Sequence, residues 1–131
     1  MPEIKRILIV GQCHADGPAM VEQFQRELPG VDVREVSSAT DLQRQSPGPD
    51  TLVMINRVLE GGYDTDSGID LISKLRQSPT PPATMLITNY PQWQQKAVEA
   101  GALPGFGKSA LYDKATTQLV KSAIKANEPR P

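Results

Sequence analysis

Leu52-Val53-Met54-Ile55-Asn56 is the stretch that decides the fold, because four apolar residues follow one another without polar alternation and end at a polar one. The runs Ile7-Leu8-Ile9-Val10 and Thr84-Met85-Leu86-Ile87-Thr88 have the same character. Short, continuous, β-branched runs are typical of strands buried on both faces of a sheet. The weaker, alternating residues 31–36 predict an edge strand, and residues 103–107 predict a short fifth strand.

Helical patterns occupy the intervals between these runs. Apolar residues recur at helical spacing after Asp16-Gly17-Pro18 and again after the Asp66-Ser67 cap. A short helix is expected over residues 38–45, and another begins at Pro91 and ends before Gly101. The helix that begins at Pro91 bears Trp93, Ala97 and Val98. The expected apolar stripes of the other helices are Val21, Phe24 and Leu28; Ile69, Ile72 and Leu75; and, in the last helix, Leu111, Ala115, Leu119 and Ile124.

A strand followed by a helix therefore occurs five times with short connections. This order predicts an α/β fold of the (βα)5 type: a doubly wound, five-stranded parallel sheet with helices on both faces. In such folds the functional residues follow the carboxyl ends of the strands. The residues at those positions are Gly11, Gln12, Cys13 and His14; Asn56 and Arg57; Thr88 and Asn89; and Lys108 and Ser109.

Length and charge narrow the class of protein. The 131 residues include 14 Lys+Arg and 15 Asp+Glu, and this net charge of −1 argues against a nucleic-acid binder. We expect a cytoplasmic protein with no membrane contact, since no apolar run is long enough for a signal peptide or a membrane helix. The only cysteine, Cys13, excludes an intramolecular disulfide. We expect one domain over residues 1–127, followed over residues 128–131 by a disordered tail or the start of a linker.

Several segments of the sequence, taken in order, resemble the receiver domains of two-component response regulators, and the resemblance covers nearly the whole chain. Residues 52–57 resemble the third strand of that family, which ends in the phospho-accepting Asp, and residues 68–76 resemble its third helix. Thr88 ends a segment similar to the fourth strand with its switch Thr, Ala100-Gly101-Ala102 resembles the end of the fourth helix, and Lys108 falls on the family's Lys. The resemblance implies a flavodoxin-like fold and a role in phosphorelay signal transduction.

The residues that would carry the family's chemistry differ here. Asn56 stands in place of the phospho-accepting Asp, and an amide is not a competent nucleophile. Gly11 and Gln12 stand where the family has the acidic pair that holds Mg²⁺, and neither has the charge that Mg²⁺ prefers. We therefore expect a degenerate receiver with no enzymatic activity, no Mg²⁺ and no other cofactor. In it, Thr88 and Lys108 would hydrogen-bond to Asn56 in a neutral polar cluster.

Other interpretations remain open at this stage. Lys108 could pair instead with loop carboxylates, which are Asp16, Glu60, Asp64 and Asp66. The alternative function is accordingly an active phosphoacceptor that uses a displaced carboxylate, such as Asp64 or Asp66, together with Mg²⁺. An enzyme that binds a nucleotide or flavin is disfavoured because the loop after Val10 lacks a Ser/Thr/Gly-rich phosphate cradle. Cys13 and His14 have no second Cys or His with which to form a metal site.

Aromatic residues suggest where a partner binds. Gly105 occupies the position at which family members often carry an aromatic residue, and Phe106 would point to the opposite side of the strand. The resemblance implies a partner surface on the fourth helix, fifth strand and fifth helix, with Tyr90, Trp93, Phe106 and Tyr112 as candidates. The expected partner is a protein: a histidine kinase, an output protein, or a second copy of the chain in a homodimer.

Overall fold

One parallel sheet organises the chain in the computed structural model, which describes residues 4–12, 15–59, 62–63 and 65–126. The strand order within these residues is β2-β1-β3-β4-β5. The strands are β1 (Arg6–Val10), β2 (Asp32–Val36), β3 (Thr51–Asn56), β4 (Ala83–Ile87) and β5 (Leu103–Phe106). The helices are α1 (Asp16–Glu27), α2 (Ala39–Gln45), α3 (Gly68–Arg76), α4 (Pro91–Glu99) and α5 (Lys114–Ala126), with a 3-10 turn over Lys108–Ala110.

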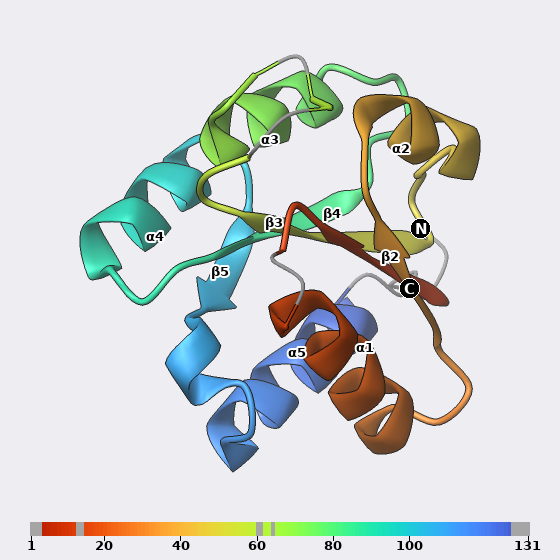
Figure 1. Cartoon of the computed structure of the whole chain (residues 1–131), viewed down its shortest axis with the longest axis vertical. Coiled ribbons are helices and arrows are strands. Elements are labelled where there is room, and N and C mark those ends of the chain that lie inside the picture. Colours follow the sequence, from red (N-terminus) through yellow and green to blue (C-terminus); the bar gives the residue numbers. More distant parts are fainter. Residues whose placement is uncertain (1–3, 13–14, 60–61, 64, 127–131) are drawn as a thin grey trace.

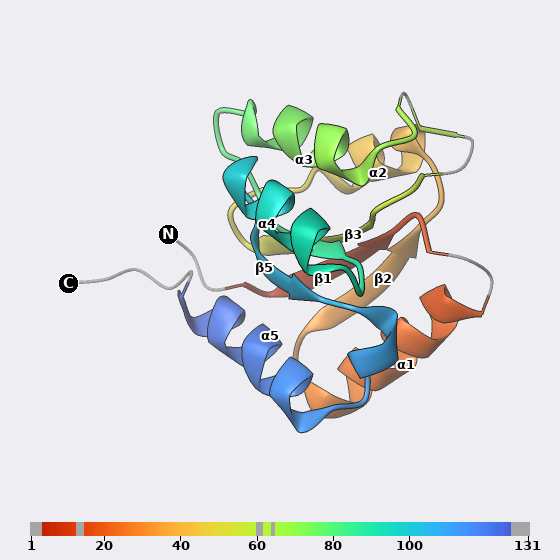
Figure 2. The ribbon, with the colours of Figure 1, turned by 90° about the vertical axis from the view of Figure 1, so that its left-hand side faces the viewer.

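The helices form two layers around the sheet. Helices α1 and α5 cover one face, and α2, α3 and α4 cover the other (Figures 1 and 2). Each face has its own core: Phe24 and Phe106 meet edge to face on the α1/α5 side, with ring centroids 5.9 Å apart. Ile72 and Leu86 belong to the core on the opposite side. The predicted fold class is therefore confirmed.

Burial on both faces explains the continuous apolar runs. In β1, β3 and β4 almost every side chain is buried, since these three strands lie inside the sheet and have a helix layer on each side. By contrast, β2 pairs only with β1 and buries Val33 and Val36 while its other residues are exposed. The prediction of an edge strand from its alternating pattern is confirmed, although it begins at Asp32.

Local capping signals mark the helix boundaries. The Ser38 hydroxyl accepts a hydrogen bond from the Asp41 N–H at the start of α2, and Ser67 accepts one from Asp70 at the start of α3. Pro91 is the first residue of α4, and Gly101 follows this helix with φ +113°. These four boundaries lie where the sequence predicted them.

The predicted buried stripe of the last helix is partly wrong. Ala115 is exposed and Leu111 is buried but precedes α5, whereas Val120 and Ala123 are in the core. Thr116 is also buried, and its polarity hid it from a pattern of apolar residues. In α4, Val98 is 43% exposed, whereas its neighbour Ala97 is buried.

The pairing of β4 with β5 is irregular. Met85 pairs with Leu103 and Ile87 with Phe106, so one strand carries an extra residue between the two pairs. Pro104 and Gly105 lie in this interval, and Pro104 has no N–H for the ladder. The irregularity leaves backbone groups that need other partners. No helix in the described part of the chain is long and apolar enough to cross a membrane.

Candidate functional site

A shallow pocket of about 220 Å³ lies at the carboxyl ends of β3, β4 and β5. Its lining includes the three residues predicted for the degenerate phosphoacceptor site, which are Asn56, Thr88 and Lys108. Each follows or ends a strand, and the parallel sheet brings these ends to one edge. The full lining is Asn56, Arg57, Val58, Ile87, Thr88, Asn89, Tyr90 and Lys108.

The predicted cluster of hydrogen bonds around Asn56 is not formed. The Asn56 amide donates to the Val58 carbonyl oxygen over 2.8 Å, which turns its side chain toward its own loop. The buried Thr88 hydroxyl accepts from the Tyr90 N–H over 3.3 Å. Both side chains therefore serve the backbone after their own strand, because a nearby loop N–H or C=O is reached at little entropic cost.

Lys108 pairs with Asp16, one of the acidic loop residues considered from the sequence. The Lys108 ammonium lies 2.9 Å from the Asp16 carboxylate, and both side chains are 36% exposed. Asp16 is the first residue of α1, where a negative charge is favoured by the helix dipole. The expected donation from Lys108 to Asn56 is replaced by this stronger, charged contact.

The position next to Gly11 is filled by an apolar side chain. Gly11 has φ +76°, and a Cβ built on it would overlap Cδ2 of Leu59. Leu59 is buried, and it comes from the segment between β3 and α3. An acidic side chain at position 11 has neither the backbone conformation nor the space it would need. This contact could not be predicted from the sequence, because Leu59 and Gly11 are distant along the chain.

The β3–α3 segment is tied to the fold at both ends and in its middle. Val58 and Ser67 form an antiparallel bridge, and the Leu59 N–H donates to the Asp66 carbonyl over 2.9 Å. The Gly62 carbonyl accepts from the Ala39 N–H at the start of α2, over 2.7 Å. We call residues 57–68 the covering loop; of these, residues 60, 61 and 64 are outside the described part. Its contacts fix Leu59 over the end of β1.

Tyr63 of the covering loop reaches the ends of β1 and β2. Its hydroxyl donates to the Val36 carbonyl over 3.0 Å. Burial raises the pKa of the Tyr63 phenol above its usual 10.0; Asp41 and Glu35 add to the rise, and a backbone hydrogen bond from Gly11 opposes it. The phenol is therefore neutral across the physiological range and acts as a hydrogen-bond donor to the sheet edge.

The residues present do not fit the Mg²⁺ ion that the receiver resemblance implies. Gln12 and Asn56 offer only neutral amide oxygens, and the Asp16 carboxylate is bound to Lys108. Both polar atoms of the Gln12 amide are buried without a hydrogen-bond partner in the described structure. Among the described residues no three His, Cys, Asp or Glu side chains are grouped as metal ligands. Mg²⁺ is usually held by one or two carboxylates, and the one carboxylate in this set of described residues, that of Asp16, already has Lys108 as its counter-ion.

A polar side chain that the sequence did not single out, that of Gln94, holds the β4–β5 side of the edge. The Gln94 amide donates to the carbonyl oxygens of Leu86, Thr88 and Phe106, over 2.9, 3.2 and 3.4 Å, and accepts from the Gly105 N–H over 3.0 Å. These bonds satisfy backbone groups left by the β4–β5 irregularity. A glutamine on an otherwise polar helix gives no sequence signal of such a role.

Asn89 links the two loops on that side. Its side-chain oxygen accepts from the hydroxyl and the N–H of Ser109, over 2.9 and 3.3 Å. The resemblance to receiver domains implies a Pro at the position of Ser109, and the Lys108–Ser109 peptide here is trans. Ser109 therefore contributes a donor that Pro would lack.

The four aromatic candidates for a partner surface separate into two groups. Tyr90 and Tyr112 are 55% and 66% exposed, as a contact surface requires. Trp93 packs partly against the core and lies under two cations, Arg57 at 5.1 Å and Lys96 at 4.9 Å from its ring centroid. Phe106 is wrong as a surface residue, because it packs against Phe24 in the core. Cys13, His14, Glu60 and Asp64 lie outside the described residues.

Neither a protein-family model nor a curated protein matches the sequence. The structure, in contrast, is similar to solved receiver domains. The signal receiver domain of a DNA-binding response regulator (merR) from Colwellia psychrerythraea 34H is 17% identical, with a TM-score of 0.71, and the match covers 92% of this chain and 98% of that one. This chain has the receiver-domain fold.

Two further receiver structures support this fold. A CheY-like response regulator receiver domain from Methylobacillus flagellatus is 25% identical, with a TM-score of 0.66, over 92% of this chain and 98% of that chain. The beryllofluoride-activated NtrC4 receiver domain, solved as a dimer in solution, is 15% identical with a TM-score of 0.73, over 95% of this chain and 100% of that chain. The match is therefore global.

Proposed function

We propose that the chain is a receiver-like signalling module that works without phosphoryl transfer and acts by contact with a protein partner. The observation that carries this proposal is the side chain of Leu59 packed against Gly11. A conventional receiver needs acidic groups beside β1 to hold Mg²⁺, and here an apolar side chain occupies that space. The module would therefore need no Mg²⁺ and no other cofactor, and would not be an enzyme.

The chemistry of position 56 supports the same proposal. Phosphoryl transfer to a receiver forms an acyl phosphate on a carboxylate, and the Asn56 amide is neutral and poorly nucleophilic. Its N–H₂ group also donates to Val58, which holds it toward the loop. Lys108, which would balance a phosphoryl charge, has the Asp16 carboxylate as its counter-ion. Asn56 and Lys108 are thus both engaged in contacts that do not serve phosphoryl transfer.

Contact with a protein is the function that the remaining surface supports. Tyr90 lies just before α4 and Tyr112 just before α5, and both aromatic rings are exposed. Tyrosine is enriched at protein interfaces because its ring buries a large area with few rotatable bonds. The structurally similar NtrC4 receiver is a dimer. A second copy of the chain, a kinase or an output protein are the partners we consider.

A phosphorylation assay tests the proposal directly. The protein is incubated with Mg²⁺ and acetyl phosphate, and separately with Mg²⁺ and beryllofluoride, while intact mass and amide NMR spectra are recorded. We expect no phosphoryl adduct and no shifts at Gly11, Asn56, Thr88 or Lys108. Asn56→Asp should also remain unlabelled, because Leu59 still occupies the position beside Gly11. Asn89→Asp, which adds a carboxylate to the same pocket, is the matched control.

The opposite result would identify the alternative function. A mass adduct mapped to a carboxylate such as Asp66 would establish a phosphoacceptor with displaced chemistry, and the proposal would be wrong. Efficient labelling of Asn56→Asp alone would contradict the role given to Leu59. A conventional receiver treated in parallel shows that the phosphodonor is active.

A further inference from the structure

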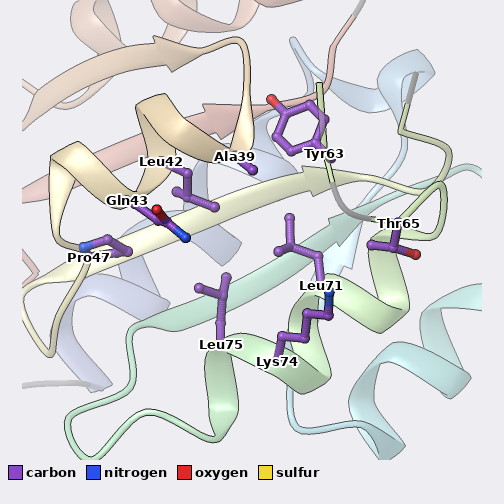
Figure 3. Close-up of a pocket in the computed structure, with 9 residues that line it drawn as sticks. All are labelled: Ala39, Leu42, Gln43, Pro47, Tyr63, Thr65, Leu71, Lys74 and Leu75. Carbon is purple, nitrogen blue, oxygen red and sulfur yellow. The ribbon is translucent and has the colours of Figure 1, made fainter. Parts of the chain in front are cut away.

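A second cavity lies on the other side of the covering loop, between α2 and α3. It has a volume of about 200 Å³ and an apolar interior. Leu42 of α2 faces Leu71 and Leu75 of α3, and the ring of Tyr63 lies over one end of the space (Figure 3). We call this cavity the α2–α3 groove; its lining residues are Ala39, Leu42, Gln43, Pro47, Tyr63, Thr65, Leu71, Lys74 and Leu75.

Two side chains that line the α2–α3 groove can bind an anion. The carboxylates around it are Asp70, which is engaged with Thr65, and Asp41 and Glu35, which act on its Tyr63 end. Lys74 is exposed, lies one turn from Leu71 on the same helix, and forms no ion pair within the described structure. The Thr65 hydroxyl donates to the Asp70 carboxylate over 3.2 Å, and the Tyr63 hydroxyl donates to Val36. The lining groups that can still donate a hydrogen bond to a ligand are the Lys74 ammonium and the Gln43 amide. A carboxylate is the group that best complements them.

The surroundings of the groove favour a small molecule over a protein segment. The large apolar residues exposed in the described structure are Val58, Tyr90, Val98 and Tyr112, and none of them lines the groove. A stable protein interface needs at least about 1,000 Å² of buried surface, including an apolar centre. Here the apolar surface is confined to the cavity, and its volume is below the roughly 300 Å³ at which pockets for drug-sized ligands begin.

We propose that the α2–α3 groove binds a small carboxylate with an aromatic ring or a branched aliphatic chain. The ring or chain lies among Leu42, Leu71 and Leu75, and the carboxylate accepts hydrogen bonds from Lys74 and Gln43. This inference does not depend on whether the chain accepts a phosphoryl group. Because Tyr63 covers the groove and also belongs to the covering loop, an occupied groove contacts the segment that holds Leu59 over Gly11.

The binding test uses two probes, 3-phenylpropanoate and 4-methylpentanoate, titrated into ¹⁵N-labelled full-length protein. We expect saturable amide shifts at Leu42, Tyr63, Leu71 and Leu75, with dissociation constants of about 1 mM for such small ligands. The uncharged 3-phenylpropanamide should bind about threefold to fivefold more weakly, as expected for the loss of one partly exposed ion pair.

A matched pair of lysine variants assigns the charge. Lys74→Gln should weaken the binding of 3-phenylpropanoate about threefold to fivefold and leave the binding of the amide analogue unchanged. Lys121→Gln, at an exposed lysine of α5, should change neither affinity. Both substitutions are on exposed helical positions, so the variants are expected to fold, and their NMR spectra verify this.

Several results would overturn the proposal. One is a carboxylate that binds no better than its amide, and another is a set of shifts located away from the groove. Concentration-dependent shifts of the groove amides without any ligand would make a second copy of the chain the occupant. Binding of the peptide acetyl-Glu-Leu-Leu-Glu-amide at least about tenfold more tightly than either probe would make a protein segment the occupant.

Discussion

The two halves of the sheet's carboxyl edge are built in different ways. On the β1–β3 half, Leu59 and Tyr63 of the covering loop pack over the strand ends. On the β4–β5 half, Gln94 and Asn89 hold the strand ends and loops through hydrogen bonds. The half that would need negative charge for Mg²⁺ is therefore closed by apolar packing. The half that keeps Thr88 and Lys108 is stabilised by polar contacts that require no ligand.

The largest effect is expected from a side chain at position 11. Gly11→Ala should lower the free energy of unfolding by about 3 kcal/mol, since positive φ costs about 1 kcal/mol and the clash with Leu59 adds the rest. Gly30→Ala is the control, because Gly30 also has positive φ, +93°, but nothing within 4 Å of its Cβ position. It should cost only about 1 kcal/mol. Urea denaturation measures both values, and equal losses would contradict the packing of Leu59 against Gly11.

On the other half of the edge, Gln94→Ala should lower the free energy of unfolding by about 2 kcal/mol, because it leaves backbone groups of Leu86 and Gly105 unpaired. The neighbouring Gln95 is exposed, so Gln95→Ala should change stability by less than about 0.5 kcal/mol. Hydrogen exchange of the Gly105 amide provides a local readout. If its protection is the same in Gln94→Ala as in the wild type, the side chain does not hold this strand.

Tyr63 connects stability to pH on the covered half. In the folded chain its pKa is raised, so the unfolded chain loses this proton first as the pH rises. The stabilisation of the fold by the neutral Tyr63 phenol is complete below about pH 10, and it is lost as the pH rises through the folded-state pKa of Tyr63. Tyr63→Phe should cost about 1 kcal/mol at neutral pH through the lost bond to Val36. It should also remove part of the alkaline loss, which urea titrations across that range measure. An identical alkaline loss in both proteins would exclude Tyr63 as its source.

The smallest effect concerns the ion pair that joins the two halves. A double-mutant cycle with Lys108→Met and Asp16→Asn should give a coupling of about 0.5 kcal/mol, because both groups are partly exposed to water. The coupling should decrease at high salt. The cycle is needed because Asp16 also lies at the start of α1. Replacing Asp16 alone would therefore also remove a negative charge that the helix dipole favours. A coupling that does not change with salt would contradict a direct ion pair.

The sequence was sufficient for the fold because strand burial and helix capping leave local patterns. Val53 and Leu86 lie in continuous apolar runs, and Ser67 and Pro91 begin helices by general rules. The same order of strands placed Asn56, Thr88 and Lys108 at one edge, and in the structure these three residues line one pocket.

The contacts within that edge could not be predicted, since they depend on which distant loop reaches which strand end. Leu59 lies in a loop whose sequence reveals no target, and Gln94 has the polarity of a surface residue. Phe106 was placed on the surface because the resemblance to receiver domains implies a partner surface that includes the fifth strand. Its burial follows from the side of the sheet that it faces, where Phe24 of α1 packs against it.

The two outer strands affect how this protein behaves at high concentration. On β5, only four residues long, Pro104 has no N–H to offer to an incoming chain. On β2, the exposed Asp32, Arg34 and Glu35 place charges along the other margin. Short strands, prolines and charges at sheet margins discourage pairing with strands of other molecules. Both margins thus oppose amyloid-like growth by strand pairing.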